Sequence, residues 1–287
     1  MATLHQTYPD EILDRLHESM LEILDAIAEV CDKNDISWYL AAGTALGALR
    51  HGGFIPWDDD IDVGMMREDY DRFLEIAPQA LPERFEILIP GVTPGYAPLF
   101  AKVCIKGTRF WTDETMEAGL DMGIFVDIWP RDYVAADPVL RRKQEQQSNL
   151  LRSMMYLYYS QNVHARLKGI SAKVFPKLFP IAHKVLPVVT SDDAIRRKFA
   201  ELQIAPGAKS VGTTCFPSSG FRVLPESLFE HFDTIEFAGR RYPVPTPCEE
   251  YCRLVYGEDW NQLPPMEKRV NHAPLVLDFG DGVNVFA

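Results

Sequence analysis

The sequence predicts an α/β (α+β) protein with one sizeable core, and two observations lead to this prediction. Apolar residues recur at helical spacing over 10–32 and 67–81, whereas the shorter apolar runs 85–90 and 122–132 are typical of buried strands. The chain has 287 residues, of which 47% are hydrophobic, so it can fill one large domain or one domain with a subdomain.

Helix and strand alternate in the first part of the chain. After the opening helix, residues 36–43 are predicted as a strand that ends at Gly43, and 44–52 as a short helix that follows this glycine. Residues 61–65 form a second short strand. Helical spacing then returns over 67–81 and is closed by Pro82.

The rest of the chain is predicted in the same way. Residues 85–90 and 99–111 are strand-like, the latter alternating about Gly107, and 122–132 is a β-rich run that Pro130 stops. A helix runs from Asp137 to about Asn162. Beyond about residue 210 we expect short strands, a hairpin over 235–245 with Gly239 at its turn, and a helix over 247–257.

Charge and cysteine content limit the classes of function. The formal charge of −12 argues against a nucleic-acid binder, because such proteins gather Lys and Arg against phosphates. The five cysteines suit reduced thiols; Cys248 and Cys252 could form half of a metal site, but no second Cys/His pair has ligand spacing. We find neither a signal peptide nor an apolar run of about 18 residues, and therefore expect a cytoplasmic protein without a membrane span.

Residues 146–191 differ from the rest of this acidic chain, because they contain no Asp or Glu. Such a segment is either an ordinary helical subdomain with a solvated basic face or a surface that docks on an anionic membrane. The second alternative predicts a peripheral protein at the inner face of the plasma membrane. The positive charges are Arg152, Arg166, Lys168, Lys173, Lys177 and Lys184.

Four aspartates, Asp58, Asp59, Asp60 and Asp62, lie within five positions of one another. In a strand, Asp60 and Asp62 leave one face while Ile61 and Val63 pack on the other. Two carboxylates so close repel each other, and a divalent cation removes the conflict. Mg²⁺ is typically held by carboxylates together with phosphate oxygens, so the pattern indicates a phosphorylated ligand. The alternative is a solvated acidic surface or a set of helix caps.

The neighbouring segments offer what such a ligand needs. Gly43 permits close approach of the backbone, Thr44 supplies a hydroxyl, and the following helix presents unpaired N–H groups to an anion. Asp127 interrupts an apolar run in another strand, which is costly unless the charge is paired or binds a metal. It could complete the metal site, act as a general base, or simply pair with Arg131.

These residues resemble a known family. "GTALGALRHGGFIPWDDDIDVGMMREDYDRF", from Gly43, closely resembles the signature of the LicD family of phosphocholine transferases, which are related to fukutin-type phosphotransferases in the nucleotidyltransferase superfamily. "GIFVDIWPRD" and "EEYCRLVYGEDWNQLPPMEKRVNHAP" are similar to its later blocks. The likeness covers roughly 15–130 and 245–275.

The resemblance implies a nucleotidyltransferase-like mixed sheet flanked by helices, with an added helical subdomain. From the composition of the chain together with this resemblance, we expect a core over 1–140, a basic and apolar helical insertion over 141–205, and a part over 206–287 that completes the catalytic domain. Asp60 and Asp62 match the paired metal aspartates, Asp127 the third carboxylate, and Asp58 a further aspartate of the fukutin relatives. Gly43 and Thr44 match the phosphate-binding turn. The expected cofactor is Mg²⁺ or Mn²⁺.

By the same resemblance, the enzyme would move phosphocholine from CDP-choline onto a sugar hydroxyl of a cell-surface glycan precursor and release CMP. The glycan would be of the teichoic acid or lipopolysaccharide type, and a lipid-linked acceptor would suit membrane docking. Three alternatives remain: transfer of ribitol or glycerol phosphate from another CDP-alcohol, a glycosyltransferase, or a non-catalytic module that binds a nucleotide or Ca²⁺.

Several other side chains are candidates for substrate contacts. Trp57, Trp111 and Trp129 flank the acidic segments and could cage a quaternary ammonium, with Trp57 nearest to the aspartates, although core packing is the commoner use. His272 could relay a proton or be structural. The cations that could neutralise a diphosphate are Arg50, His51, Arg67, Lys102, Lys106, Lys268 and Arg269.

Overall fold

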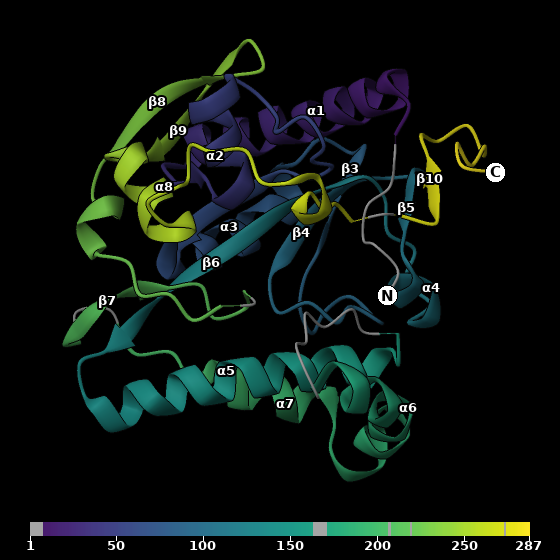
Figure 1. Ribbon diagram of the computed structural model, residues 1–287, viewed down its shortest axis with the longest axis vertical. Helices are drawn as coiled ribbons and strands as arrows, with labels where there is room; N and C mark the ends of the chain where they lie inside the picture. The colour runs from purple at the N-terminus through teal and green to yellow at the C-terminus, as the bar shows by residue number, and fades with distance from the viewer. Residues whose placement is uncertain (1–7, 163–170, 206–207, 219, 273) are drawn as a thin grey trace.

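The computed structural model describes residues 8–162, 171–205, 208–218, 220–272 and 274–287, with the side chains of 171–177 left out. It confirms the α/β class. The central sheet has the strand order β1-β2-β6-β4-β3, and a further strand, β7, pairs with β6. β2 and β6 are parallel while the other neighbours are antiparallel, so the sheet is mixed, and helices lie on both sides of it (Figure 1).

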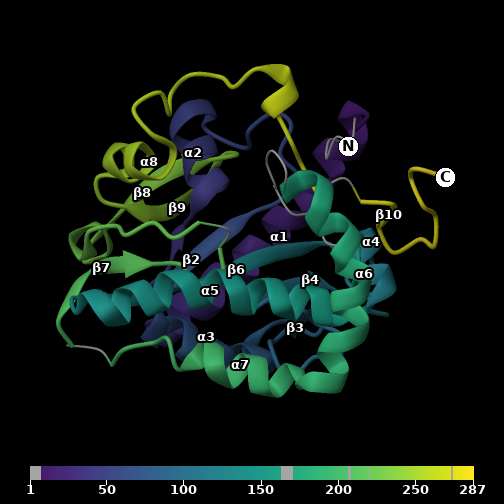
Figure 2. The same cartoon turned by 60° about the horizontal axis from the view of Figure 1, so that its bottom comes forward.

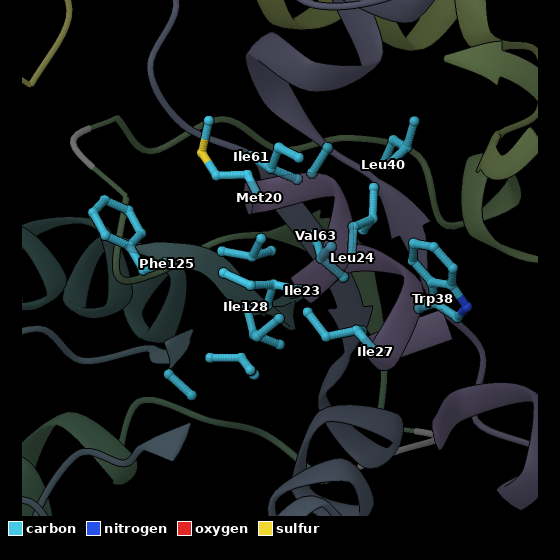
Figure 3. Close-up of a cluster of buried hydrophobic side chains, with 14 of the residues drawn as sticks. Met20, Ile23, Leu24, Ile27, Trp38, Leu40, Ile61, Val63, Phe125 and Ile128 are labelled. Atoms are coloured by element: carbon cyan, nitrogen blue, oxygen red, sulfur yellow. The ribbon is translucent and has the colours of Figure 1, made fainter. Parts of the chain in front are cut away.

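The opening helix is α1 (Asp10–Asn34), which confirms the predicted helix. Its apolar side packs on one face of the sheet. Figure 3 shows Met20, Ile23 and Leu24 of this helix close to Val63 and Ile128 from the central strands and to Ile61, the residue before one of them. Because side chains alternate along a strand, this packing turns Asp62 and Asp127 toward the opposite face.

The strand that precedes the acidic segment is shorter than predicted. β1 contains only Tyr39–Leu40, and α2 (Ala42–His51) begins before Gly43, so the prediction that the strand ends at Gly43 was wrong. The chain leaves the sheet at Ala41, whose N–H donates to the backbone oxygen of Asp62, and turns through Ala42, which has a φ of 41°. The Ala42 N–H donates to the Tyr251 hydroxyl instead of to a strand.

β2 (Asp62–Met66) and β6 (Phe125–Ala135) form the parallel centre of the sheet, with Asp62 opposite Asp127. The prediction that Pro130 stops the strand was wrong. The Asp127 N–H donates toward β2, so the backbone nitrogen of Pro130, three positions on, faces the other edge. On that edge, β4 pairs with β6 only as far as Ile128, and β7 pairs with β6 only from Asp132 onward. Pro130 therefore costs no hydrogen bond between strands.

The elements between β2 and β6 follow the prediction closely. α3 (Arg67–Ala80) is the expected helix, and β3 (Phe85–Leu88) the expected strand. The strand predicted over 99–111 is divided into β4 (Ala101–Ile105) and β5 (Arg109–Trp111) by a turn at Gly107, which has a φ of 79°. A short helix, α4 (Asp113–Glu117), follows a capping box at Thr112 and was not predicted.

A layer of helices lies beside the sheet and is formed by α5 (Pro138–Tyr159), α6 (Ser171–Val189) and α7 (Asp192–Ala200) (Figure 2). α5 confirms the predicted helix over 137–162. This layer has a small core of its own. The division at residues 140 and 205 stays a prediction. The buried members of the small core are Leu99, Leu151, Met155, Ile195, Phe199, Leu202 and Phe216.

The C-terminal part returns to the first half of the chain. β7 (Ser210–Thr214) pairs with β6, and β10 (Val276–Asp278) pairs with β5. β8 (Phe232–Phe237) and β9 (Arg240–Pro245) confirm the predicted hairpin, and α8 (Cys248–Tyr256) confirms the predicted helix. Two 3-10 turns, η1 (Glu226–Phe229) and η2 (Met266–Lys268), complete the fold. Within the described residues, every helix is too short or too polar to cross a membrane.

Candidate metal centre

Three carboxylates, two from the paired strands β2 and β6 and one from the segment before β2, meet on the face of the sheet opposite α1. One oxygen from each of Asp60, Asp62 and Asp127 lies within 4.8 Å of the other two, a spacing that allows a single cation to bind all three. The pairing of β2 with β6 places Asp62 beside Asp127, and Asp60 lies two residues before Asp62, the first residue of β2. The convergence predicted from alternation is therefore present. Asp62 and Asp127 are buried, and Asp60 is the most accessible.

The electrostatics of this cluster favour a cation. Burial raises the pKa of Asp62 well above its ordinary value, and the neighbouring Asp60 and Asp127 raise it further. The pKa of Asp60 is also raised, first by burial, although His272 opposes the shift. Negative charge on all three carboxylates is thus costly without a counterion. The oxygen donors, their spacing and this unmet charge fit Mg²⁺ or Mn²⁺.

Lys102 supplies part of the missing charge. Its ammonium forms a buried ion pair with Asp127 and lies 3.4 Å from the centroid of the Phe125 ring. The alternative in which Asp127 pairs with Arg131 was wrong, because Arg131 donates to the Tyr39 hydroxyl and to Thr213. Lys102 comes from β4, which pairs with β6 and has Lys102 opposite Asp127. It therefore belongs to the cluster rather than to a distant substrate-binding surface.

A second group of side chains adjoins the cluster. Asp59 is fully buried, and it accepts hydrogen bonds from the Tyr8 hydroxyl at 2.6 Å and from the His272 backbone N–H at 2.9 Å. Nδ1 of His272 lies 3.0 Å from Asp59, and its Nε2 lies 3.8 Å from Asp60. Burial favours the neutral imidazole, but Asp60 and Asp59 outweigh it and raise the pKa of His272 to about 10.

Sequence reasoning missed Asp59 and left His272 undecided between a proton relay and a structural residue. The His272 imidazole lies between Asp59 and Asp60. There it offsets part of the electrostatic repulsion that raises the pKa of Asp60. In the sequence, only the resemblance of the "VNHAP" segment to a block of the family indicated that His272 has a functional role. The local pattern of residues does not predict that His272 contacts Asp59.

The first turn of α2 lies against the acidic segment. The Thr44 hydroxyl accepts from the Asp62 N–H at 2.8 Å, which fixes the start of β2. A side-chain carbon at Gly43 would lie 2.9 Å from an Asp58 carboxylate oxygen, so a larger residue would require the Asp58 side chain to move. Asp58 stands outside the three-carboxylate group, although Asp60 and Asp62 add to burial in raising its pKa. Its role as a ligand stays a prediction.

The predicted substrate cations are dispersed. Arg50 donates to the backbone oxygens of Trp260 and Gln262 and so holds the loop after α8. The guanidinium of Arg269 lies 4.4 Å from the centroid of the Trp57 ring, while Lys268 is exposed at the end of η2. The Asn271 amide donates to the Trp57 backbone oxygen, so this segment lies beside the acidic one. Roles for all four predicted residues, Arg50, Trp57, Lys268 and Arg269, stay predictions.

The indoles and the remaining cations have other contacts. Trp129 donates from Nε1 to Asp62 at 2.6 Å and stacks on Phe100, and Trp111 lies beside the Arg109 guanidinium. Trp57 is covered by Arg269, so each of the three rings already has a neighbour on it. Arg67 forms a bidentate pair with Asp132, Lys106 donates to the Glu83 backbone, and His51 accepts from Arg50.

Comparison with known proteins agrees with the arrangement of the site. The pattern of the family described as "LicD/FKTN/FKRP, nucleotidyltransferase domain" matches residues 35–87, which contain Gly43, Thr44 and the four aspartates of the acidic segment. The chain is 28% identical over 258 residues to the lipopolysaccharide cholinephosphotransferase LicD of Haemophilus influenzae, an alignment that covers 88% of this chain and 92% of that protein.

Two shorter matches fall on other relatives. An uncharacterized protein of Rickettsia typhi is 44% identical over 61 residues, which are 21% of this chain and 20% of that protein. The human ribitol 5-phosphate transferase FKRP is 42% identical over 43 residues, which are 15% of this chain and 9% of that protein. The family pattern over residues 35–87 and the match along most of its length make this chain similar to the LicD family.

Proposed function

We propose that this protein is a metal-dependent phosphotransferase that moves phosphocholine from CDP-choline onto a sugar hydroxyl of a cell-surface glycan precursor, of the lipopolysaccharide or teichoic acid type. The observation that carries the proposal is the convergence of Asp60, Asp62 and Asp127 from separate segments. The likeness to a lipopolysaccharide cholinephosphotransferase along most of the chain supports the transferred group and the class of acceptor.

Asp60, Asp62 and Asp127 would hold the ion, Mg²⁺ or Mn²⁺. When bound, the cation would neutralise the charge of the diphosphate oxygens as the leaving group departs. The first turn of α2 would direct the N–H groups of Gly43 and Thr44 at a phosphate, since the first N–H groups of a helix have no partner within it. Lys268 and Arg269 would add positive charge at the entrance.

The reaction exchanges one phosphorus–oxygen bond for another. The acceptor hydroxyl oxygen bonds to the phosphorus nearer choline, and the bond from that phosphorus to the bridging oxygen breaks, so that CMP leaves with this oxygen. The hydroxyl proton passes to a carboxylate of the cluster, with Asp127 as the candidate base. Lys102 holds the Asp127 carboxylate in place, and Nε2 of His272 lies 3.8 Å from Asp60, where this histidine would counter negative charge.

A panel of donors tests this function. With Mg²⁺ and a glycan precursor, CDP-choline should yield CMP faster than CDP-ribitol or CDP-glycerol does. CDP-ribitol is included because 43 residues of this chain are 42% identical to a ribitol 5-phosphate transferase. Faster CMP release from CDP-ribitol would change the proposed donor to that CDP-alcohol. The absence of CMP from every donor would exclude the activity.

We propose further that α6 docks on an anionic membrane, where lipid-linked acceptors would lie. Its described part exposes an apolar stripe at three- and four-residue spacing, with Lys184 exposed beside it. Arg166 and Lys168 lie outside the described residues, as do the side chains of Lys173 and Lys177. The stripe consists of Leu178, Ile181, Val185, Val188 and Val189, which are between 45% and 84% exposed.

We expect the double variant Ile181→Ser, Val188→Ser to weaken co-sedimentation with phosphatidylglycerol-containing vesicles by about tenfold, since each substitution removes apolar carbons that would enter the lipid. Binding should also weaken with added salt. Val139→Ser on α5, at a position that is 77% exposed, is the matched control and should bind normally. Equal binding by the double variant would contradict docking through this stripe.

A further inference from the structure

A cavity of about 340 Å³ opens beside the metal centre and is not used by the function proposed so far. Its wall is formed by β6, the start of α2, α8 and the segment that follows β7. Asp62 lies at its edge, and Trp129, Arg131, Tyr251 and Tyr256 line it. The volume is at the small end of the range for ligand pockets, about 300–1,000 Å³.

Arg131 is the unusual residue of this cavity. It is only 8% exposed, yet among the described residues its hydrogen-bond partners are neutral. Nε donates to the Tyr39 hydroxyl at 2.9 Å, one terminal nitrogen lies 3.4 Å from Thr213, and Phe229 packs on the guanidinium. Buried arginines are generally paired with an anion, and a guanidinium has five N–H donors. Arg131 therefore has capacity for a ligand in the cavity.

β6 orders the groups of the cavity along one line. Asp127, Trp129 and Arg131 alternate on the same face, and the rise of about 3.3 Å per residue separates the first and last by roughly 13 Å. A diphosphate held at Asp127 would therefore project its nucleoside past Trp129 toward Arg131. Gly64, which faces Trp129 in the neighbouring strand, leaves room for the Tyr39 ring that reaches Arg131.

We propose that this cavity binds the nucleoside of the CDP-alcohol donor, with Arg131 donating to the O2 and N3 acceptors of the cytosine edge. This inference rests on the proposed function and names the recognition element within it. Tyr256 and Tyr251 offer aromatic surface to a base. A quaternary ammonium does not suit the cavity, because Arg131 and Arg222 line it and repel a cation. The choline end of the donor is thereby directed away from Arg131.

The test measures equilibrium binding of CMP and UMP by calorimetry in metal-free buffer. Cytosine N3 accepts a hydrogen bond whereas uracil N3–H donates one, so a guanidinium fork favours CMP. Arg131→Met should weaken CMP binding about ten- to a hundredfold and bring the CMP-to-UMP affinity ratio close to one. The matched control is Arg197→Met, on α7, whose side chain is 72% exposed; it should leave both affinities unchanged.

Tyr256→Ala keeps the inference testable if Arg131→Met fails to fold. This half-exposed ring can be removed at little structural cost, and its loss should weaken CMP and UMP binding equally, by roughly tenfold. Unchanged CMP affinity in either folded variant, or an unchanged CMP-to-UMP ratio in Arg131→Met, overturns the assignment. If nucleotide binding by these variants is unchanged while the wild-type protein turns over CDP-choline, only the assignment of the cavity is wrong. Tight, Arg131-dependent CMP binding without transfer to any acceptor contradicts the proposed reaction alone.

Discussion

Replacing Asp62 by Asn is expected to slow CMP release from CDP-choline by about a thousandfold. The side chain keeps its shape and can still accept from Trp129, but the cluster loses one anionic ligand. A metal ligand of this kind contributes several kcal/mol of transition-state stabilisation, and about 4 kcal/mol corresponds to this change in rate. Steady-state measurement at saturating Mg²⁺ tests the expectation.

The thermal stability of the same variant provides a second test, in which we expect an increase although the rate decreases. Without metal, Asp62→Asn should melt at a higher temperature than the wild type, because burial and two neighbouring carboxylates make its negative charge unfavourable in the folded protein. Added Mg²⁺ should raise the melting temperature of the wild type and have far less effect on the variant.

The control for this experiment is Asp121→Asn, which removes one negative charge at an exposed position outside the cluster. It should change neither the rate nor the response to Mg²⁺. If Asp62→Asn retained more than about a tenth of the wild-type rate, the three carboxylates would not form the catalytic metal site.

The alternation of residues along strands was enough to predict that Asp60, Asp62 and Asp127 lie together. Ile61 and Val63 are apolar and Asp60 and Asp62 are acidic, so burial of the first pair fixes the direction of the second. The same reasoning applied to Asp127, whose apolar neighbours required a buried strand. Once both strands were central, their carboxylates had to meet on one face.

Contacts between distant segments could not be predicted in this way. Local periodicity does not show that His272 returns to Asp59, or that Lys102 lies opposite Asp127. The prediction that Pro130 stops the strand failed for a related reason. A proline destabilises a strand only where its missing N–H would have bonded to a neighbouring strand, and the sequence does not show which strand lies beside Pro130. Arg131 was considered only as a partner of Asp127, four residues away, although β6 directs it toward Tyr39.

The buried ion pair between α3 and β6 gives the largest expected effect on stability. Arg67 donates to Asp132 through Nε at 2.7 Å and through a terminal nitrogen at 3.0 Å, and the Asp132 side chain is only 2% exposed. Asp132→Ala should lower the free energy of unfolding by about 3–5 kcal/mol, because it leaves a largely buried guanidinium with only the exposed Asp71 as an anionic partner. Urea denaturation measures this change.

The double variant Arg67→Met, Asp132→Leu removes both charges of the ion pair. It therefore separates the cost of leaving one buried charge unpaired from the contribution of the ion pair itself. Burial raises the pKa of Asp132 even though Arg67 opposes the shift, so the pair does not fully offset the desolvation of its carboxylate. Apolar replacement of both residues should therefore be neutral or stabilising. Glu29→Ala, in a pair whose side chains are more than half exposed, should cost no more than about 1 kcal/mol. If Asp132→Ala and Glu29→Ala had equal effects, the pair would not be what holds α3 against β6, the strand that carries both Asp127 and Arg131.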